Sequence, residues 1–281
     1  MTSSPGLTEI ATGVWVWRSP WLDVNISVVR GERGLLVVDT HGSAAAGSEI
    51  ATAIAALGAG PVVEIVNTHA HFDHWFGNHA IATELGGPAA VVVRAHEDAL
   101  DGMRAELAEA GADAPDPVLL PDATFSSACV VDLGDRAVEV VHPGRGHTNA
   151  DVVLRIPDVD IVLAGDLVEQ CDASEDTPGF GADCFPLDWP LTLDLVRQLC
   201  TPSTLVVPGH GRIVDAEFVS DQRARIGVLA ETVRDLAGRG LRAEQALEAA
   251  TEWPFPPDRI GEAVRRAYEH LPRAQKRLPL I

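Results

Sequence analysis

Apolar residues recur along the chain with two periods, and these periods predict mixed strands and helices. Short β-branched runs between turn-forming residues are typical of strands, and they occur at residues 14–17, 25–29, 35–38, 62–66, 90–93, 130–141, 152–156, 161–163 and 205–207. Residues 130–141 hold two strands that turn at 134–135. Longer segments with apolar positions three or four apart are typical of helices, and they occur at residues 43–57, 80–85, 97–110, 187–199 and 216–271, the last broken at 238–240 and 253–257.

This order of elements predicts an α/β (α+β) fold in which two mixed sheets pack together with helices on the outside. The sequence contains no fixed-period repeat and no clear linker. We therefore expect one domain over residues 1–215 and a helical extension over 216–281 packed on the same domain. Residues 170–190 are rich in Gly, Asp and Pro, and they predict a long loop of the kind that forms functional lids.

Composition narrows the classes of partner. The 281 residues are 46% hydrophobic and carry a net charge of −20, so a sizeable core is expected, and nucleic acid and anionic membranes are disfavoured as partners. The sequence shows no signal peptide and no bilayer-spanning run, which predicts a cytoplasmic location. The four cysteines form no C-x-x-C pair, so we expect reduced thiols. A small molecule is the expected substrate.

One segment carries most of the chemistry. Residues 68–74 read Thr-His-Ala-His-Phe-Asp-His, so four candidate metal ligands follow the apolar strand 62–66 directly: His69, His71, Asp73 and His74. Neutral imidazole nitrogen and carboxylate oxygen suit Zn²⁺, and they also suit Fe or Mn. A solvated histidine cluster is the alternative, and the buried strand just before it makes that alternative the weaker one.

Three further strand ends have the same pattern. His147 follows Gly146, Asp166 follows Gly165, and His210 follows Gly209, each after an apolar strand. Glycine beside a ligand allows the backbone to approach closely. A lone Gly-His pair says little, but four strand ends with seven ligand-type residues predict one shared metal site.

The motif His69-x-His71-x-Asp73-His74, followed by His147, Asp166 and His210 in that order, resembles the metallo-β-lactamase superfamily over about residues 8–214. The resemblance implies an αββα four-layer sandwich with the metal site at the sheet edge. It implies one metal held by His69, His71 and His147 and a second held by Asp73, His74 and His210, with Asp166 bridging the two. Asp39 resembles the family's strand-end aspartate near the site.

The resemblance further implies a dinuclear zinc-dependent hydrolase that acts on a small ester, thioester, lactone or amide through a metal-bound hydroxide. Asp73 is expected to be catalytic, because it can orient the hydroxide and pass a proton to the leaving group. Asp39 and Asp151 are expected to hold ligand imidazoles by their other N–H.

Three alternatives remain open. Asp166 stands where many β-lactamases of the family have Cys or Ser, so β-lactam hydrolysis is a narrower alternative. An iron-dependent oxidoreductase of the sulfur dioxygenase type is another. Iron-containing electron-transfer members usually carry Glu at the position of His71, which favours a hydrolase here. A non-catalytic role predicts a missing ligand, and none is missing.

Aromatic residues are only 5% of the chain, and five of them lie in sequence near the predicted ligands or in the 170–190 loop. We expect these five to wall a substrate pocket, with ordinary packing as the alternative for each: Trp75, Phe76, Phe180, Phe185 and Trp189. Arginines after residue 258 predict a solvated helix face, with a surface for a second subunit, and hence a homodimer, as the alternative.

Overall fold

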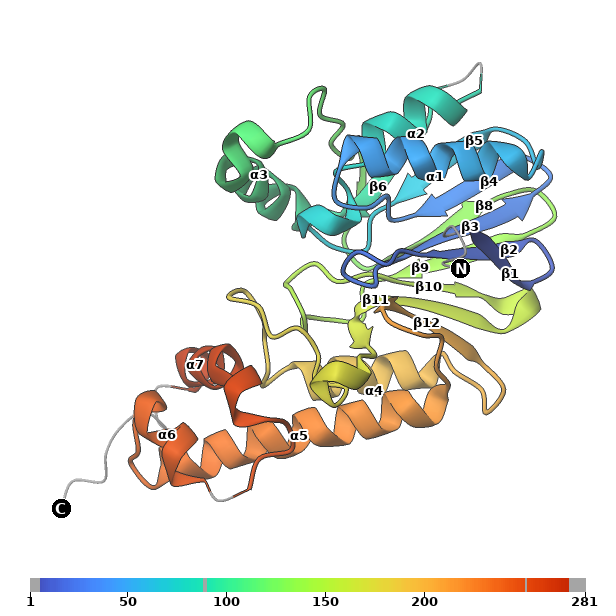
Figure 1. The fold of residues 1–281 in the computed structure, drawn as a ribbon. Helices are drawn as coiled ribbons and strands as arrows, with labels where there is room; N and C mark the ends of the chain where they lie inside the picture. The colour runs from blue at the N-terminus through green and yellow to red at the C-terminus, as the bar shows by residue number, and fades with distance from the viewer. Residues whose placement is uncertain (1–5, 88–89, 251, 273–281) are drawn as a thin grey trace.

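The computed structural model describes residues 6–87, 90–250 and 252–272, and it has four layers (Figure 1). Two β-sheets pack against each other in the middle, one group of helices covers the outer face of the first sheet, and a second group covers the outer face of the other. The predicted αββα sandwich of two mixed sheets is therefore confirmed.

The first sheet has seven strands in chain order: β1 (Leu7–Ala11), β2 (Val14–Arg18), β3 (Asn25–Gly31), β4 (Gly34–Val38), β5 (Val62–Val66), β6 (Val92–His96) and β7 (Ala123–Phe125). Strands β1 to β4 are antiparallel, whereas β4 to β7 run parallel. The parallel strands β4 and β5 therefore end at the same edge of the sheet, which is where Asp39 and the segment 67–74 begin.

The second sheet has five strands, in the spatial order β12-β11-β10-β9-β8: β8 (Ala128–Asp132), β9 (Ala137–Val141), β10 (Val153–Ile156), β11 (Ile161–Glu169) and β12 (Leu205–His210). Strands β8 to β11 are antiparallel, and β12 pairs with β11 in parallel. Strand β11 is six residues longer than the sequence predicts, so Asp166 lies within it rather than after it.

In the described part of the chain, seven α-helices connect and cover the sheets: α1 (Ala44–Ala56), α2 (Asn78–Leu85), α3 (Ala99–Ala110), α4 (Trp189–Gln198), α5 (Ala216–Gly238), α6 (Ala243–Ala249) and α7 (Gly261–His270). Short 3₁₀ turns lie at η1 (Phe72–His74), η2 (Gly111–Asp113), η3 (Pro157–Val159), η4 (Asp172–Ser174) and η5 (Pro257–Arg259). All of the predicted helices are present, with ends shifted by a few residues.

None of the helices in the described ranges has an apolar stretch of the length needed to cross a membrane.

Strand alternation explains why the sheets are covered on both faces. In β4, Leu35 and Val37 pack with the helix side of the first sheet, whereas Leu36 and Val38 pack between the two sheets. Successive side chains of a strand point to opposite faces, so a strand that is apolar throughout needs a partner layer on each side.

The C-terminal helices share their core with the second sheet. Val162 of β11, Leu193 of α4, Ile226 of α5 and Val264 of α7 belong to one buried apolar cluster. The division of the chain at residue 215 stays a prediction, and the final part of the predicted extension, residues 273–281, lies outside the described residues.

A buried amide pair fixes the segment that carries the ligand motif. Asn67 donates to the carbonyl of His74 at 3.1 Å and to Asn78 Oδ1 at 3.0 Å. Asn78 donates back to Asn67 Oδ1 at 2.8 Å and accepts from Thr40 Oγ1 at 2.8 Å. Buried amides that satisfy each other in this way tie the end of β5 to the start of α2.

We therefore expect Asn78→Ala to lower the free energy of unfolding by about 1–3 kcal/mol, because it leaves the buried Asn67 Oδ1 without its donor and removes the shorter hydrogen bond of the Thr40 hydroxyl. Urea unfolding of the variant and of the exposed control Gln198→Ala measures the effect. The control should change stability by less than about 0.5 kcal/mol. Equal effects of the two substitutions would show that the amide pair does not contribute to the free energy of unfolding beyond an ordinary surface residue.

Candidate metal centre

The seven residues predicted as ligands come together at one edge of the sandwich, between the ends of the two sheets. Four come from the segment after β5, which turns through η1: His69, His71, Asp73 and His74. The other three come from the loop after β9 and from β11 and β12: His147, Asp166 and His210. Segments more than 130 residues apart in sequence thus supply one cluster.

The cluster divides into two groups. Within each group, the ligand atoms lie within 4.8 Å of one another. One group holds His69, His71, His147 and Asp166, and the other holds Asp73, His74 and His210. This division places the residues as the resemblance implies for a pair of metal ions.

Asp166 lies between the two groups. Its Oδ2 is 3.4 Å from His147 Nε2 and 3.3 Å from His210 Nε2, and its Oδ1 is 3.4 Å from His74 Nε2. One carboxylate therefore faces imidazoles from both groups, which is the position a bridging ligand needs.

Unsatisfied atoms support a metal at this place. Within the described part of the chain, His69 Nε2 and Asp166 Oδ1 are buried and have no hydrogen-bond partner. An orphaned buried polar atom costs roughly 1–3 kcal/mol, so native proteins rarely keep two in one cluster without a ligand. Imidazole and carboxylate donors in this number fit a divalent cation.

Asp39, at the end of β4, organises two of the imidazoles. Its Oδ2 lies 2.8 Å from His74 Nδ1 and accepts from Thr68 Oγ1 at 2.8 Å. Because the Thr68 hydroxyl gives its hydrogen to Asp39, it accepts from His69 Nδ1 at 3.0 Å. Both rings are thereby held with Nε2 toward the cluster, as expected for Asp39.

Each remaining imidazole also has a group near its outer nitrogen. His210 Nδ1 donates to the carbonyl of Leu22 at 2.8 Å, and His71 Nε2 lies 3.2 Å from Asp183 Oδ2. His147 Nδ1 lies 3.7 Å from the half-buried carboxylate of Glu169. Asp183 and Glu169 were not predicted from the sequence, because an isolated acidic residue in a loop or a strand carries no local signal.

Asp151 plays a different part from the one expected. It accepts hydrogen bonds from Thr148, from the backbone N–H at 3.0 Å and from the hydroxyl at 2.7 Å, and no hydrogen bond joins its carboxylate to a ligand imidazole among the described residues. The prediction that Asp151 holds an imidazole N–H is therefore wrong. Asp151 fixes the turn that follows His147.

Two glycines allow the carboxylate of Asp166 to reach the cluster. Gly165 has a positive φ of 52°, and a Cβ on it would lie 2.9 Å from Thr68 Cβ. A Cβ on Gly209 would lie only 1.7 Å from Asp166 Oδ1. Glycine beside Asp166 and beside His210 is thus required by close approach, as the sequence pattern suggests.

The environment moves the pKa values of the ligands in different directions. Burial lowers the pKa of His71, but the hydrogen bond with Asp183 and the negative charges of Asp183 and Asp166 together outweigh burial and raise the pKa to about 9. For His210, burial is likewise outweighed by the charge and hydrogen bond of Asp166 together with the charge of Glu169, and the pKa rises to about 10. Burial lowers the pKa of His147 to about 4. His71 and His210 therefore hold protons at pH 7 that a metal must displace.

A cavity of about 520 Å³ opens beside the ligand segment. His71, Asp73, Phe72 and Phe76 form one side, and the other side comes from α3 and η2. Phe76 thus lies at the predicted place.

The other four aromatic residues expected in the pocket wall pack elsewhere. Trp75 is buried and donates to the carbonyl of Ala70. Trp189 is buried in the apolar cluster shared by β11, α4, α5 and α7, and its ring lies edge-to-face with that of His147. Phe180 packs in the same apolar cluster, and Phe185 stacks on the ring of His270 at 4.7 Å. None of the four lines the cavity beside the ligands, because each has an apolar or aromatic partner within the fold.

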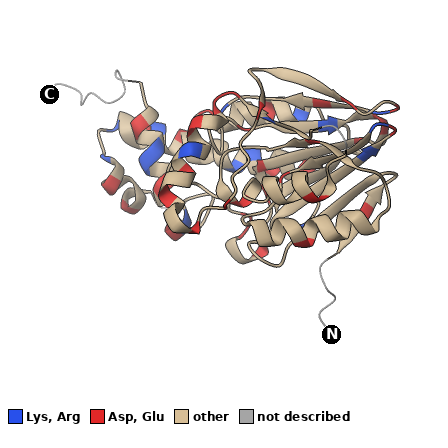
Figure 2. Ribbon diagram, turned by 90° about the horizontal axis from the view of Figure 1, so that it is seen from above, with Lys and Arg blue, Asp and Glu red and all other residues tan. Residues whose placement is uncertain are grey.

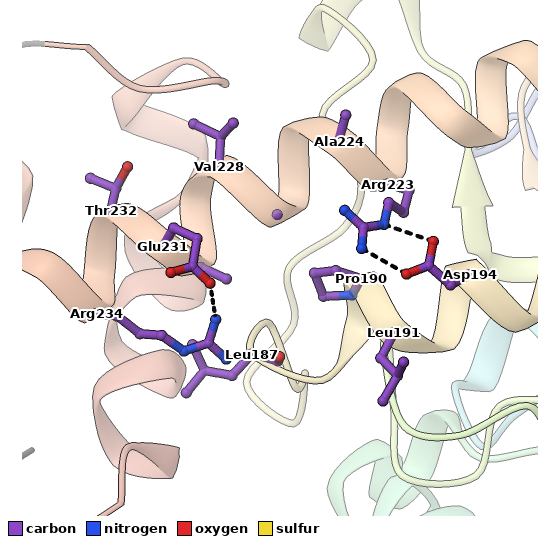
Figure 3. Close-up of a pocket in the computed structure, with 12 residues that line it drawn as sticks. Leu187, Pro190, Leu191, Asp194, Arg223, Ala224, Val228, Glu231, Thr232 and Arg234 are labelled. Atoms are coloured by element: carbon purple, nitrogen blue, oxygen red, sulfur yellow. Dashed lines mark hydrogen bonds and ion pairs between the residues drawn. The ribbon is translucent and has the colours of Figure 1, made fainter.

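A second cavity, of about 540 Å³, lies far from this chemistry (Figure 3). It runs between α4 and α5, with Leu191 and Val228 on its sides and the Arg223–Asp194 ion pair at one end. None of the seven predicted ligands lines it, so we place the candidate active site at the first cavity.

Asp183 provides a test of how His71 is oriented. We expect Asp183→Ala to weaken metal affinity about 10–100-fold, because loss of a carboxylate on a ligand imidazole has this order of effect. Competition with a chromophoric chelator measures the affinity. The control is Asp188→Ala, in the same loop, whose carboxylate pairs with Arg145 instead. Equal affinities of the two variants would contradict the role of Asp183.

The pKa values predict a proton release. Because the pKa values of His71 and His210 are raised to about 9 and about 10, both imidazoles are protonated at pH 7, and metal binding needs them neutral. Binding should therefore release protons at pH 7, and affinity should rise as the pH increases toward 9. Calorimetric titration in two buffers of different ionisation enthalpy measures the release, and Asp183→Asn should reduce it. A binding enthalpy that does not depend on the buffer would contradict the raised pKa values.

Comparison with known proteins finds a matching family model and curated relatives. The family model described as the metallo-beta-lactamase superfamily matches residues 19–210. A metallo-beta-lactamase type 2 from Bacillus cereus is 28% identical over 221 residues, which cover 76% of this chain and 79% of that protein. A protein of the same description from Bacillus sp. strain 170 is 27% identical with the same coverage.

Solved structures agree with the fold. A metallo-beta-lactamase from Pontibacter korlensis is 26% identical and superposes with a TM-score of 0.66, covering 80% of this chain and 99% of its own. A stereoselective inverting sec-alkylsulfatase from Pseudomonas sp. is 16% identical with a TM-score of 0.72, covering 94% of this chain and 50% of its own. Since the family model spans the segments that bring all seven ligand-type residues together, the chain belongs to the metallo-β-lactamase superfamily.

Proposed function

We propose that the protein is a dinuclear zinc-dependent hydrolase of a small ester, thioester, lactone or amide. The observation that carries the proposal is the convergence of seven His and Asp side chains in two groups, with buried ligand atoms that have no partner among the described residues. Membership of a superfamily of metal-dependent hydrolases supports the same reaction class.

The residues fit two ions of the zinc class. His69, His71 and His147 would hold one ion, and Asp73, His74 and His210 would hold the other. Asp166 would touch both, because its two oxygens face both groups. When bound, such ions supply Lewis acidity, which acidifies water and polarises the oxygen of a substrate carbonyl.

Asp73 is suited to handle protons. It lines the cavity and lies in the cluster, with its Oδ2 at 3.4 Å from His210 Nε2. A carboxylate at this boundary can accept a proton from the attacking water and deliver it to the leaving group. The cavity, which α3 also lines, has a volume of about 520 Å³, and this is enough for the body of a small substrate.

Hydrolysis of a β-lactam is the second candidate, because the curated relatives from Bacillus are described as metallo-beta-lactamases. The carboxylate at Asp166 favours the broader ester and thioester class, since many β-lactamases of the family have Cys or Ser there. Iron in place of zinc would favour the oxidoreductase alternative.

Elemental analysis and two ligand variants test the proposal. We expect two zinc ions per chain, and we expect His71→Ala and Asp166→Ala to lose metal and at least about 100-fold of turnover, more than loss of an outer partner costs. His79→Ala, outside the cluster on α2, is the matched control and should keep both. The assays are a panel of ester, thioester, lactone, phosphodiester and β-lactam substrates. Full metal and full turnover in His71→Ala and Asp166→Ala, or iron in the purified protein, would overturn the assignment.

A further inference from the structure

The cavity beside the ligand segment has two chemically different walls. One wall is aromatic, with Phe72 and Phe76, and another, on α3 and η2, is acidic, with Glu106, Glu109 and Asp113. None of the residues described as lining this cavity is Lys or Arg. The lining also includes His71 and Asp73 of the metal cluster, so a molecule in the cavity lies beside the reacting centre.

Part of the aromatic surface at this wall is exposed to solvent. Phe72 is 36% exposed although it follows a ligand directly, and its ring packs edge-on against Phe76, with 5.7 Å between centroids. Trp21, which is 44% exposed, extends the same surface, with its ring centroid 6.0 Å from that of Phe72. Aromatic faces left open to solvent attract organic cations through the negative charge of the ring face.

The acidic wall is held in place by the ligand segment itself. Glu106 on α3 is half-buried and accepts a hydrogen bond from the backbone N–H of Phe72. Glu109 lies three residues further along α3 and therefore on the same helix face, and Asp113 follows in η2. Three carboxyl groups on one wall repel each other, and a bound cation would relieve that repulsion.

We propose that this cavity binds an alkylammonium group, so that the enzyme prefers cationic esters and thioesters to anionic ones. This inference rests on the proposed function and names the substrate class for that site. A bound metal pair would attract the carbonyl oxygen, while the aromatic and acidic walls hold the ammonium. The charge of each end of the substrate thus determines where that end binds. An anionic group in the cavity would be repelled by the carboxylates.

The net charge of −20 does not account for such a preference by itself. Acidic residues are spread over many helices and loops (Figure 2), and charges separated by more than about 10 Å are largely screened at 0.1 M salt. The preference must therefore depend on the carboxylates at the cavity. Removal of the same number of charges elsewhere should leave it unchanged.

Binding tests this directly. Calorimetry with the metal-loaded protein compares hexyltrimethylammonium with hexane-1-sulfonate. The metal ions alone favour the sulfonate, so preference for the ammonium reports on the walls. We expect the ammonium to bind about tenfold more tightly at about 0.1 M salt, in line with a cation–π contact supported by carboxylates, and the ratio to fall as more salt is added.

Two double variants locate the preference. Glu109→Gln with Asp113→Asn removes two exposed charges of the wall and leaves Glu106 on its backbone hydrogen bond, and it should reduce the binding ratio at least about threefold. Glu248→Gln with Glu252→Gln removes two exposed charges on and just after α6 and should not change the ratio. Equal or tighter binding of the sulfonate, or equal effects of the two double variants, would overturn the inference.

Kinetics separates this inference from the proposed function. The substrates are butyrylthiocholine, its neutral isostere 3,3-dimethylbutyl thiobutyrate and 2-sulfoethyl thiobutyrate, with kcat/KM divided by the rate of hydrolysis by hydroxide. We expect the order cationic, neutral, anionic. Preferential ammonium binding without turnover of any substrate in the panel would refute the proposed function alone. Equal turnover of all three would refute the charge preference alone.

Discussion

The geometry of the metal centre depends on the carboxylate of Asp39. It accepts from the backbone N–H and the hydroxyl of Thr68 and pairs with His74 Nδ1, each at 2.8 Å. Through Thr68 it also sets the ring of His69. A buried carboxylate is tolerated only with such partners, and these partners fix the nitrogens that face the cluster. Asp39 itself has a φ of 62°, a left-handed conformation that Asp tolerates and that turns the chain sharply after β4.

The C-terminal helices reach the same centre indirectly. Asp183, beside His71, belongs to the loop between β11 and α4, and Arg266 of α7 donates to the carbonyl of the next residue, Cys184, at 3.1 Å. The guanidinium of Arg266 also lies 5.4 Å from the centre of the Phe185 ring. The helical segment after residue 215 therefore helps to hold a loop that orients a ligand, besides covering the second sheet.

Most of the fold follows from local patterns, because strands buried on both faces are apolar throughout and their ends are marked by Gly, Pro or Asn. The patterns fail at the sheet edges. Strand β1 has exposed Thr8 and Glu9, and β7 has only three residues, so neither shows a clear period. Strand β11 continues past Leu163 because β12 pairs with it as far as Glu169, despite Gly165 and Asp166 in its middle. Pairing with a neighbour overrides the local signal there.

The sequence by itself predicted the seven candidate ligands and two mixed sheets covered by helices, because the His and Asp residues follow apolar strands and the strands and helices alternate in a clear order. The resemblance to a family added the αββα arrangement. Only the tertiary structure decided which residues serve those ligands and which form the cavity. Asp183 meets His71 across 112 positions of chain, and α3 supplies the acidic wall of a cavity whose aromatic wall comes from the ligand segment. Local periodicity records which face of an element is buried, whereas contacts between distant loops depend on how the layers pack.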